Sequence, residues 1–274
     1  MHIGFDKIMD AIIAKNLDIE FPIYGTQGRS LRHLLFLSPL TSIPKRFVGS
    51  KSVGGTVKER SDGVLAVNAL HNINLRLKNG DRLGLIGHNG SGKTTLLRAL
   101  AGIYEPTNGS LVTRGKIMPL FNITEGMAPD ATGRELIQVR CVLLGIEQAD
   151  ITRATPDIIE FCQLGDYLDM PIRTYSQGML VRLAFAITTA FRADILLFDE
   201  LIGAGDASFV EQAHKRLSDF VERSNVLVVA SHSTEIIRKW CNRAILLEHG
   251  ELLMDADVES VLDAYAARVP TYAG

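Results

Sequence analysis

The run of residues whose types and spacing point most clearly to chemistry is Gly87-His88-Asn89-Gly90-Ser91-Gly92-Lys93-Thr94. Glycines let successive backbone N–H groups turn inward around an anion, and a following helix N-terminus adds a favourable dipole. In this pattern Lys93 reaches the terminal phosphates, the Thr94 hydroxyl ligates Mg²⁺, and Thr95 is close enough to assist at a phosphate. The run therefore predicts a loop that binds the phosphates of ATP together with Mg²⁺.

The elements around this loop must position it. Residues 82–86 read as a strand and 94–101 as a helix, which is the context that a phosphate-binding loop requires. The competing interpretation, a tight surface turn that happens to contain glycines and a lysine, does not explain both flanks. Before them, residues 72–77 alternate polar and apolar side chains, and Asn79-Gly80 predicts a hairpin that joins this strand to 82–86.

A pair of carboxylates ends the apolar run 195–198. Asp199 and Glu200 follow a segment typical of a buried parallel strand, and the carboxyl ends of such strands face the ligand crevice. We expect Asp199 to help hold Mg²⁺ and Glu200 to orient and deprotonate the attacking water. His232 follows the next apolar run, 226–230, where a neutral imidazole can donate to the γ-phosphate. The alternatives are solvated carboxylates and a structural histidine.

The remaining periodicity indicates a layered α/β fold. Apolar residues recur at helical spacing, and short apolar runs separate the helices. Two short strands joined at His249-Gly250 and a closing helix end the chain. The expected helices are 133–144, 156–162, 179–191, 210–223 and 258–268.

Composition excludes several classes of protein. The chain has 274 residues with 29 basic and 31 acidic side chains, so it lacks the basic excess typical of nucleic-acid binding. Cys141, Cys162 and Cys241 are odd in number and lie among apolar residues, which favours buried reduced thiols. Residues 1–16 lack the pattern of a secretory signal, and no apolar run approaches the roughly twenty residues of a membrane span. Any membrane role is expected to come through a partner.

Over nearly its whole length the chain resembles the ATP-binding cassette (ABC) ATPases. Their Leu-Ser-Gly-Gly-Gln stretch corresponds here to Tyr175-Ser176-Gln177-Gly178-Met179, which departs from it at Gln177 and Met179. The resemblance implies that Ser176 and Gly178, at a helix start, bind the γ-phosphate of ATP held by an opposite subunit. It therefore implies a homodimer.

The resemblance also assigns roles to residues that their own neighbours do not reveal. Asn122 is the nearest substitute for a family glutamine that touches Mg²⁺, and Asp206 is the key acid of the turn after the carboxylates. An aromatic side chain stacks on adenine in the family. Phe21 is the first candidate and Tyr24 the next, although either also suits a hydrophobic core.

Four features resemble the branch that exports polysaccharides or polyol phosphates, such as O-antigen, capsule or teichoic acid. They are the Ser176 stretch, the turn at Asp206, the segment 132–135 and the amphipathic segment 31–37. The branch implies two transmembrane permease subunits and a peripheral location at the cytoplasmic face of the inner membrane. The segment 31–37 lies near the membrane in that branch, but a plain surface helix fits it equally. Residues 38–62 read as an exposed loop or irregular hairpin.

The expected architecture is one phosphate-loop domain of ABC type, with a mixed central sheet, an antiparallel β subdomain and an inserted helical subdomain. It is expected to span 1–274, with an N-terminal part at 1–62, a core at 63–118 and 193–256, helices at 119–192 and a C-terminal helix at 257–274. A separate carbohydrate-binding domain is not expected.

Three other functions compete with glycan export. The first is an ABC transporter for another substrate. The second is an ABC ATPase acting on chromosomes or ribosomes, but such proteins usually carry a coiled-coil insertion or a second cassette. The third is an enzyme that transfers phosphate to a small metabolite. It leaves Ser176, Gly178 and His232 without a role.

Overall fold

The computed structural model describes residues 10–23, 51–52, 55–59, 64–199 and 207–268. The chain divides into two compact units, one formed by 1–114 and 230–274 and the other by 115–229. Tyr24, Glu200, Asp206 and the segment 31–37 lie outside the described residues.

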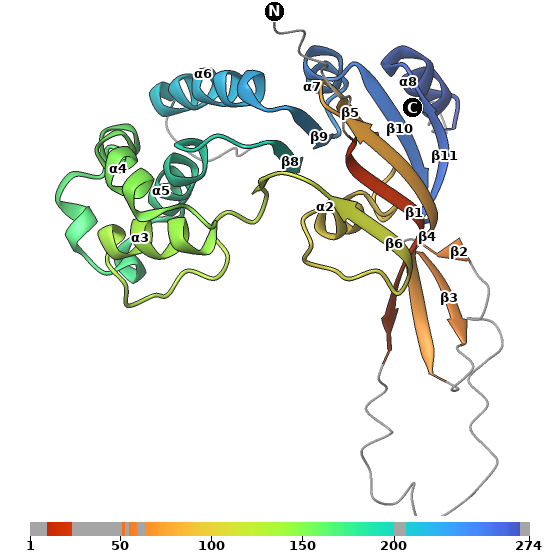
Figure 1. Ribbon diagram of the computed structural model, residues 1–274, viewed down its shortest axis with the longest axis horizontal. Helices are drawn as coiled ribbons and strands as arrows, with labels where there is room; N and C mark the ends of the chain where they lie inside the picture. Colours follow the sequence, from red (N-terminus) through yellow and green to blue (C-terminus); the bar gives the residue numbers. More distant parts are fainter. Residues whose placement is uncertain (1–9, 24–50, 53–54, 60–63, 200–206, 269–274) are drawn as a thin grey trace, which may run out of the picture. The chain divides into compact units, whose positions relative to one another are not determined.

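The first unit contains an antiparallel sheet in the order β2-β3-β4-β1-β6. Its long strands β1 and β4 pair along most of their length (Figure 1). On β4 the alternating residues Ile73, Leu75 and Leu77 are buried, as the sequence pattern predicts. The short pair β2 and β3 occupies part of the stretch 38–62. The bounds are β1 Asp10–Pro22, β2 Lys51–Ser52, β3 Gly55–Glu59, β4 Leu65–Lys78 and β6 Asn108–Thr113.

The predicted hairpin at Asn79-Gly80 is wrong. The turn itself forms, because the Asp81 N–H donates to the Lys78 carbonyl at 3.0 Å. However, β4 pairs with β1 and β3, whereas β5 (Arg82–Ile86) pairs in parallel with β10 (Arg243–Glu248). The physical reason is the burial pattern, since β5 is apolar on both faces and suits a covered parallel strand.

The same unit ends in the predicted pair of strands and closing helix. Strands β10 and β11 (Glu251–Ala256) are antiparallel, and His249 and Gly250 between them have φ values of 50° and 82°. Both φ values are positive, as in the tight turns that join the strands of a hairpin. The described residues of this unit also form the helices α2 Lys93–Leu100, α7 Thr234–Trp240 and α8 Val258–Ala266.

The second unit combines strands β7, β8 and β9 with helices α3 to α6 (Figure 1). The apolar residues of β8 are all buried, which confirms the predicted covered strand. The predicted helix at 156–162 extends back to Gln148, so Pro156 lies inside α4. The bounds are β7 Ile117–Leu120, α3 Gly133–Leu143, α4 Gln148–Cys162, η2 Gly165–Asp169, η3 Ile172–Thr174, α5 Gln177–Thr189, β8 Ile195–Asp199, α6 Ala207–Arg223 and β9 Val226–Ala230.

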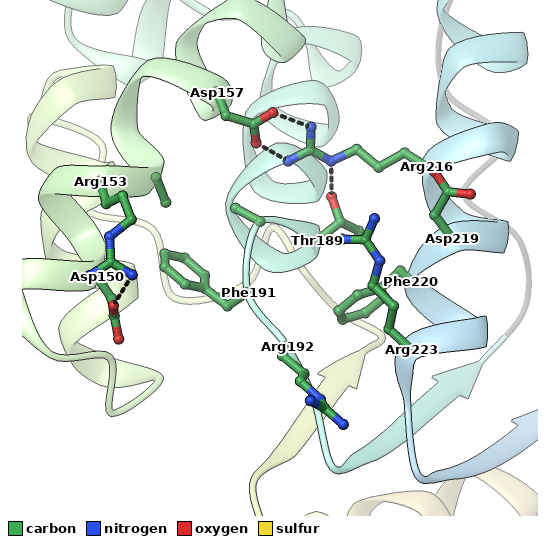
Figure 2. A pocket seen from close by; sticks show the side chains of 12 residues that line it. Asp150, Arg153, Asp157, Thr189, Phe191, Arg192, Arg216, Asp219, Phe220 and Arg223 are labelled. Atoms are coloured by element: carbon green, nitrogen blue, oxygen red, sulfur yellow. Dashed lines mark hydrogen bonds and ion pairs between the residues drawn. The ribbon is translucent and has the colours of Figure 1, made fainter.

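One arginine joins three helices of this unit, as Figure 2 shows. Arg216 on α6 donates to both carboxylate oxygens of Asp157 on α4, at 3.1 and 2.5 Å, and to the Thr189 hydroxyl on α5 at 2.8 Å. Its guanidinium also lies 4.2 Å from the ring centroid of Phe161. The planar guanidinium therefore fixes α4, α5 and α6 together. Within the described part of the chain, no helix is both long and apolar enough to cross a membrane.

Candidate nucleotide-binding site

The predicted phosphate-binding loop connects β5 to α2 in the first unit, as expected. Gly92 has φ 108°, a left-handed conformation that side chains disfavour. A Cβ atom at Gly87 would collide with the Leu247 carbonyl oxygen and the Ser91 side chain. Glycines are thus required at both positions for the loop to close tightly on itself.

Lys93 lies inside this loop rather than in solvent. Lys93 is only 8% exposed. Its Nζ donates to the carbonyl oxygens of Gly87 at 2.6 Å and His88 at 3.0 Å. These bonds hold the ammonium at the centre of the turn. A phosphate bound to the loop would therefore meet a positive charge that is already in place.

Two further observations show that the loop fits a phosphate group. The Ser91 hydroxyl is buried and has no hydrogen-bond partner among the described residues. Gly92 is the N-cap of helix α2, which has no side-chain cap and no acidic residue in its first turn. The amides of a helix N-terminus and a hydroxyl without a partner are suitable donors for phosphate oxygens. Thr94, the predicted Mg²⁺ ligand, is exposed in this first turn, and Thr95 is half-buried.

The turn between β10 and β11 lies against the loop. The Gly250 N–H donates to the Ser91 carbonyl at 2.9 Å, and the Gly250 carbonyl accepts from the His71 N–H at 2.8 Å. The ring centroids of His88 and His249 are 5.2 Å apart. The sequence indicated a turn here but gave no signal that it supports the loop, because the two segments are far apart in the chain.

The aromatic candidate Phe21 has a neighbour that the sequence did not indicate. Phe21 is 36% exposed at the end of β1, and its ring meets Tyr104 edge to face with centroids 5.0 Å apart. Tyr104 in turn accepts a hydrogen bond from Arg98 of α2 at 3.0 Å. Phe21 is thus held by a neighbouring ring but stays partly exposed, as an aromatic that stacks on a base must be.

His232 belongs to the same unit as the loop. It follows β9, and it is exposed in the bend before α7. The neighbouring Ser231 hydroxyl accepts from the Ser233 N–H at 3.0 Å, which stabilises this bend. His232 therefore lies at a strand end as predicted.

The predicted magnesium ligands Asp199 and Asn122 lie in the second unit. Strands β7 and β8 are parallel neighbours, with Leu120 opposite Phe198. Asp199 ends β8 and is half-buried, whereas Asn122 follows β7, is exposed and has φ 51°. The two side chains thus follow neighbouring strand ends at one edge of this pair.

Ser176 begins helix α5 as the sequence pattern implies. Its hydroxyl oxygen accepts from the Met179 N–H at 3.3 Å, and the residue is exposed. A Cβ at Gly178 would meet nothing nearer than 3.8 Å, so the helix start is open on that side. An exposed hydroxyl at an open helix N-terminus can bind an anion that another molecule presents.

Comparison with known proteins decides the family. The family description "ABC transporter" matches residues 70–203. The chain is 43% identical over 242 residues to the O-antigen export system ATP-binding protein RfbE of Yersinia enterocolitica, across 88% of this chain and 96% of that protein. The chain belongs to the ABC transporter family of ATPases.

Two other comparisons agree with this assignment. The ABC ATPase is 33% identical to the teichoic acids export ATP-binding protein TagH of Listeria innocua, over 79% of this chain and 64% of that protein. Its fold resembles an ATP-binding cassette solved as a dimer in a post-hydrolysis state with ADP and Pi. That likeness has a TM-score of 0.61 at 19% identity and covers 90% of this chain and 98% of the other.

A pocket of about 630 Å³ occupies another part of the ABC ATPase, within the second unit (Figure 2). Helices α4 and α6 and the residues after α5 line it, and none of the predicted nucleotide-site residues does. Arginines and aspartates share its wall, and the ion pairs Arg216–Asp157 and Arg153–Asp150 neutralise part of the charge. The pocket therefore has no strong preference for ligands of one sign.

Proposed function

We propose that this ABC ATPase powers an exporter of lipid-linked polysaccharide of the O-antigen, capsule or teichoic acid type. The observation that carries the proposal is the 43% identity to an O-antigen export ATP-binding protein, which extends over 96% of that protein's length. The match to a teichoic acid export protein supports the same class of substrate. Both substrates are glycan or polyol-phosphate polymers.

Hydrolysis of Mg²⁺-ATP would take place at the phosphate-binding loop. Thr94 and Asp199 offer hard oxygen ligands of the kind Mg²⁺ prefers, and Asn122 offers a third. Lys93 neutralises the terminal phosphates. Catalysis of this kind rests mainly on positioning and charge stabilisation.

Two further groups would act on the attacking water. Glu200 accepts its proton, and His232 donates to the γ-phosphate and fixes the geometry of attack. The adenine stacks on Phe21, with Tyr24 as the second candidate. The exposed Phe21 ring beside Tyr104 supports the first choice.

The working unit in this proposal is a homodimer bound to two permease subunits. Ser176 and Gly178 of one chain complete the ATP site of the other, and Asp206 couples the two sites. The open, exposed start of α5 supports this role, because its donors are accessible to a second molecule. The chain lies at the cytoplasmic face of the inner membrane through its permeases, and nucleic acid is not a partner.

Replacing Lys93 by Ala in the source cells tests the proposal. We expect surface glycan to disappear while lipid-linked glycan accumulates inside, because export stops when ATP is no longer bound. Surface glycan is measured by extraction and gel analysis, with Lys215→Ala on the exposed face of α6 as the matched control. Unchanged surface glycan in cells whose purified Lys93→Ala protein lacks ATPase activity would refute glycan export.

A further inference from the structure

Three possible metal ligands gather beside the phosphate-binding loop. His88 belongs to the loop, Glu248 ends β10, and His249 forms the turn to β11. One donor atom from each lies within 4.8 Å of the other two, and all three residues are half-buried. Residues from two distant segments of the chain are thus brought to one point within the first unit.

His88 makes the kind of hydrogen bond that a metal-binding histidine usually makes. Its Nδ1 lies 2.7 Å from the backbone carbonyl oxygen of Asn89. A carbonyl oxygen only accepts, so Nδ1 carries the proton in this contact and the lone pair is on Nε2. Metal-binding histidines typically donate their second N–H to a carbonyl or carboxylate in this way.

His249 contributes a buried nitrogen that lacks a partner. Its Nδ1 is inaccessible to solvent and makes no hydrogen bond within the described part of the chain. A buried polar atom without a partner destabilises the folded state. The backbone also holds this residue at φ 50°, where residues other than glycine are uncommon. A bound cation or a tightly held water would satisfy the nitrogen.

The donor set defines the kind of ion. Two imidazoles and one carboxylate suit Zn²⁺ and neighbouring transition metals, whereas Mg²⁺ prefers oxygen ligands. Two ligands about 2.1 Å from a tetrahedral ion lie about 3.4 Å apart, so donor atoms within 4.8 Å of one another need to close by about 1.4 Å at most. Small rotations of side chains around the ion can supply this movement. The Glu248 carboxylate also forms a long ion pair with Arg268, whose Nε lies 4.0 Å away.

We propose that His88, Glu248 and His249 form a binding site for a transition-metal dication such as Zn²⁺. The site is separate from the Mg²⁺ ligands of the ATP site and does not depend on the export function. The Gly250 N–H already donates to the Ser91 carbonyl, so the turn and the loop are in contact. A metal ion there adds a second link between them, and its occupancy should stiffen the loop that holds phosphate.

Metal binding to the tag-free full chain tests this site. Co²⁺ is titrated and followed by its visible absorption, and Zn²⁺ is then added to displace it. We expect one bound ion per chain that Mg²⁺ in excess does not displace. Glu248→Gln and His249→Asn should each weaken binding about 10-fold or more, because even the loss of a group that only supports a ligand typically costs about 10–100-fold. His214→Asn, which changes an exposed histidine on α6, should bind as the unchanged chain does.

Thermal unfolding gives a second readout. An ion that binds the folded state raises the unfolding midpoint, so Zn²⁺ should stabilise the unchanged chain more than either variant. Asn is chosen at position 249 because it tolerates positive φ, and Glu248→Gln carries the test if His249→Asn does not fold. Equal metal affinity in the unchanged chain and the variants would overturn the proposal, as would absence of Co²⁺ binding. The two histidines would then form only an edge-to-face pair.

Discussion

Lys93 shows at the scale of one residue why the loop is ready for phosphate. Its ammonium is buried and bound to two carbonyl oxygens of its own loop. A phosphate that binds here would place its charged oxygens beside the ammonium, in place of these carbonyls or next to them. The ammonium is already removed from water, so binding would not have to desolvate it. The desolvation of the charge therefore belongs to folding and not to nucleotide binding, which favours affinity.

The cysteines give a prediction about reactivity. Burial raises the pKa of the Cys141 thiol to about 11 and of the Cys241 thiol to about 12. Because the thiolate is the nucleophile, both should resist iodoacetamide at pH 7.5 in the folded protein and react after unfolding in urea. Mass spectrometry of the alkylated protein measures this. Rapid labelling of Cys241 in the folded state would contradict the raised pKa.

The raised pKa values of these two thiols also determine how the stability of the fold changes with pH. The folded protein keeps these thiols protonated, whereas the unfolded chain loses the protons above its ordinary thiol pKa of 9.0. Their contribution to stability is therefore complete below about pH 9 and is lost as the pH rises towards 11 or 12. Cysteine-to-alanine variants should show a smaller loss of stability over that range.

The position of the loop between a strand and a helix could be predicted because the spacing of its residues is specific. Glycine, lysine and threonine in this order have few other uses between a strand and a helix. What the sequence could not show are contacts from distant segments, such as Leu247 against Gly87 or Tyr104 against Phe21. Glu200 and Asp206 remain predictions, since they lie outside the described residues.

At the scale of elements, strand partners were harder to predict than the strands themselves. Residues 72–78 and 82–86 are strands, but each pairs with a segment far away in the sequence. In the second half of β4, buried and exposed residues alternate, as in a strand with one buried face. The residues of β5 are buried almost without interruption, as in a strand covered on both faces. That difference in burial outweighed the turn signal between them. The bounds of an inserted helical subdomain at 119–192 stay a prediction, although α3, α4 and α5 lie within them.

Arg216 provides a prediction for the helices of the second unit. Arg216→Ala removes a two-bond contact to Asp157, a bond to Thr189 and the stacking on Phe161. We expect it to lower the free energy of unfolding by about 2 kcal/mol, since the arginine is mostly buried. Arg216→Lys should recover only part of this, because lysine lacks the planar pair of donors.

Urea unfolding followed by circular dichroism measures both variants against Lys215→Ala, an exposed neighbour on the same helix. If Arg216→Ala differed from this control by less than about 0.5 kcal/mol, which is typical of surface substitutions, the helices would not depend on this contact.

At the scale of the whole molecule, we propose that two chains together form each ATP site. The phosphate-binding loop belongs to one unit and the open start of α5 to the other. An exposed Ser176 hydroxyl with free space at Gly178 suits a surface that another chain completes. A single chain should therefore hydrolyse ATP weakly until it pairs.

Mixing two inactive variants tests this claim most directly. Lys93→Ala disables the loop, and Ser176→Arg blocks the start of α5, so each variant alone should have only background ATPase activity. In an equal mixture, half of the dimers join one chain of each kind and carry one intact site. Phosphate release should then return to about a quarter of the activity of the unchanged protein if the sites act independently. Activity that stays at background in the mixture, although the two variants are shown to pair, would contradict a site shared between chains.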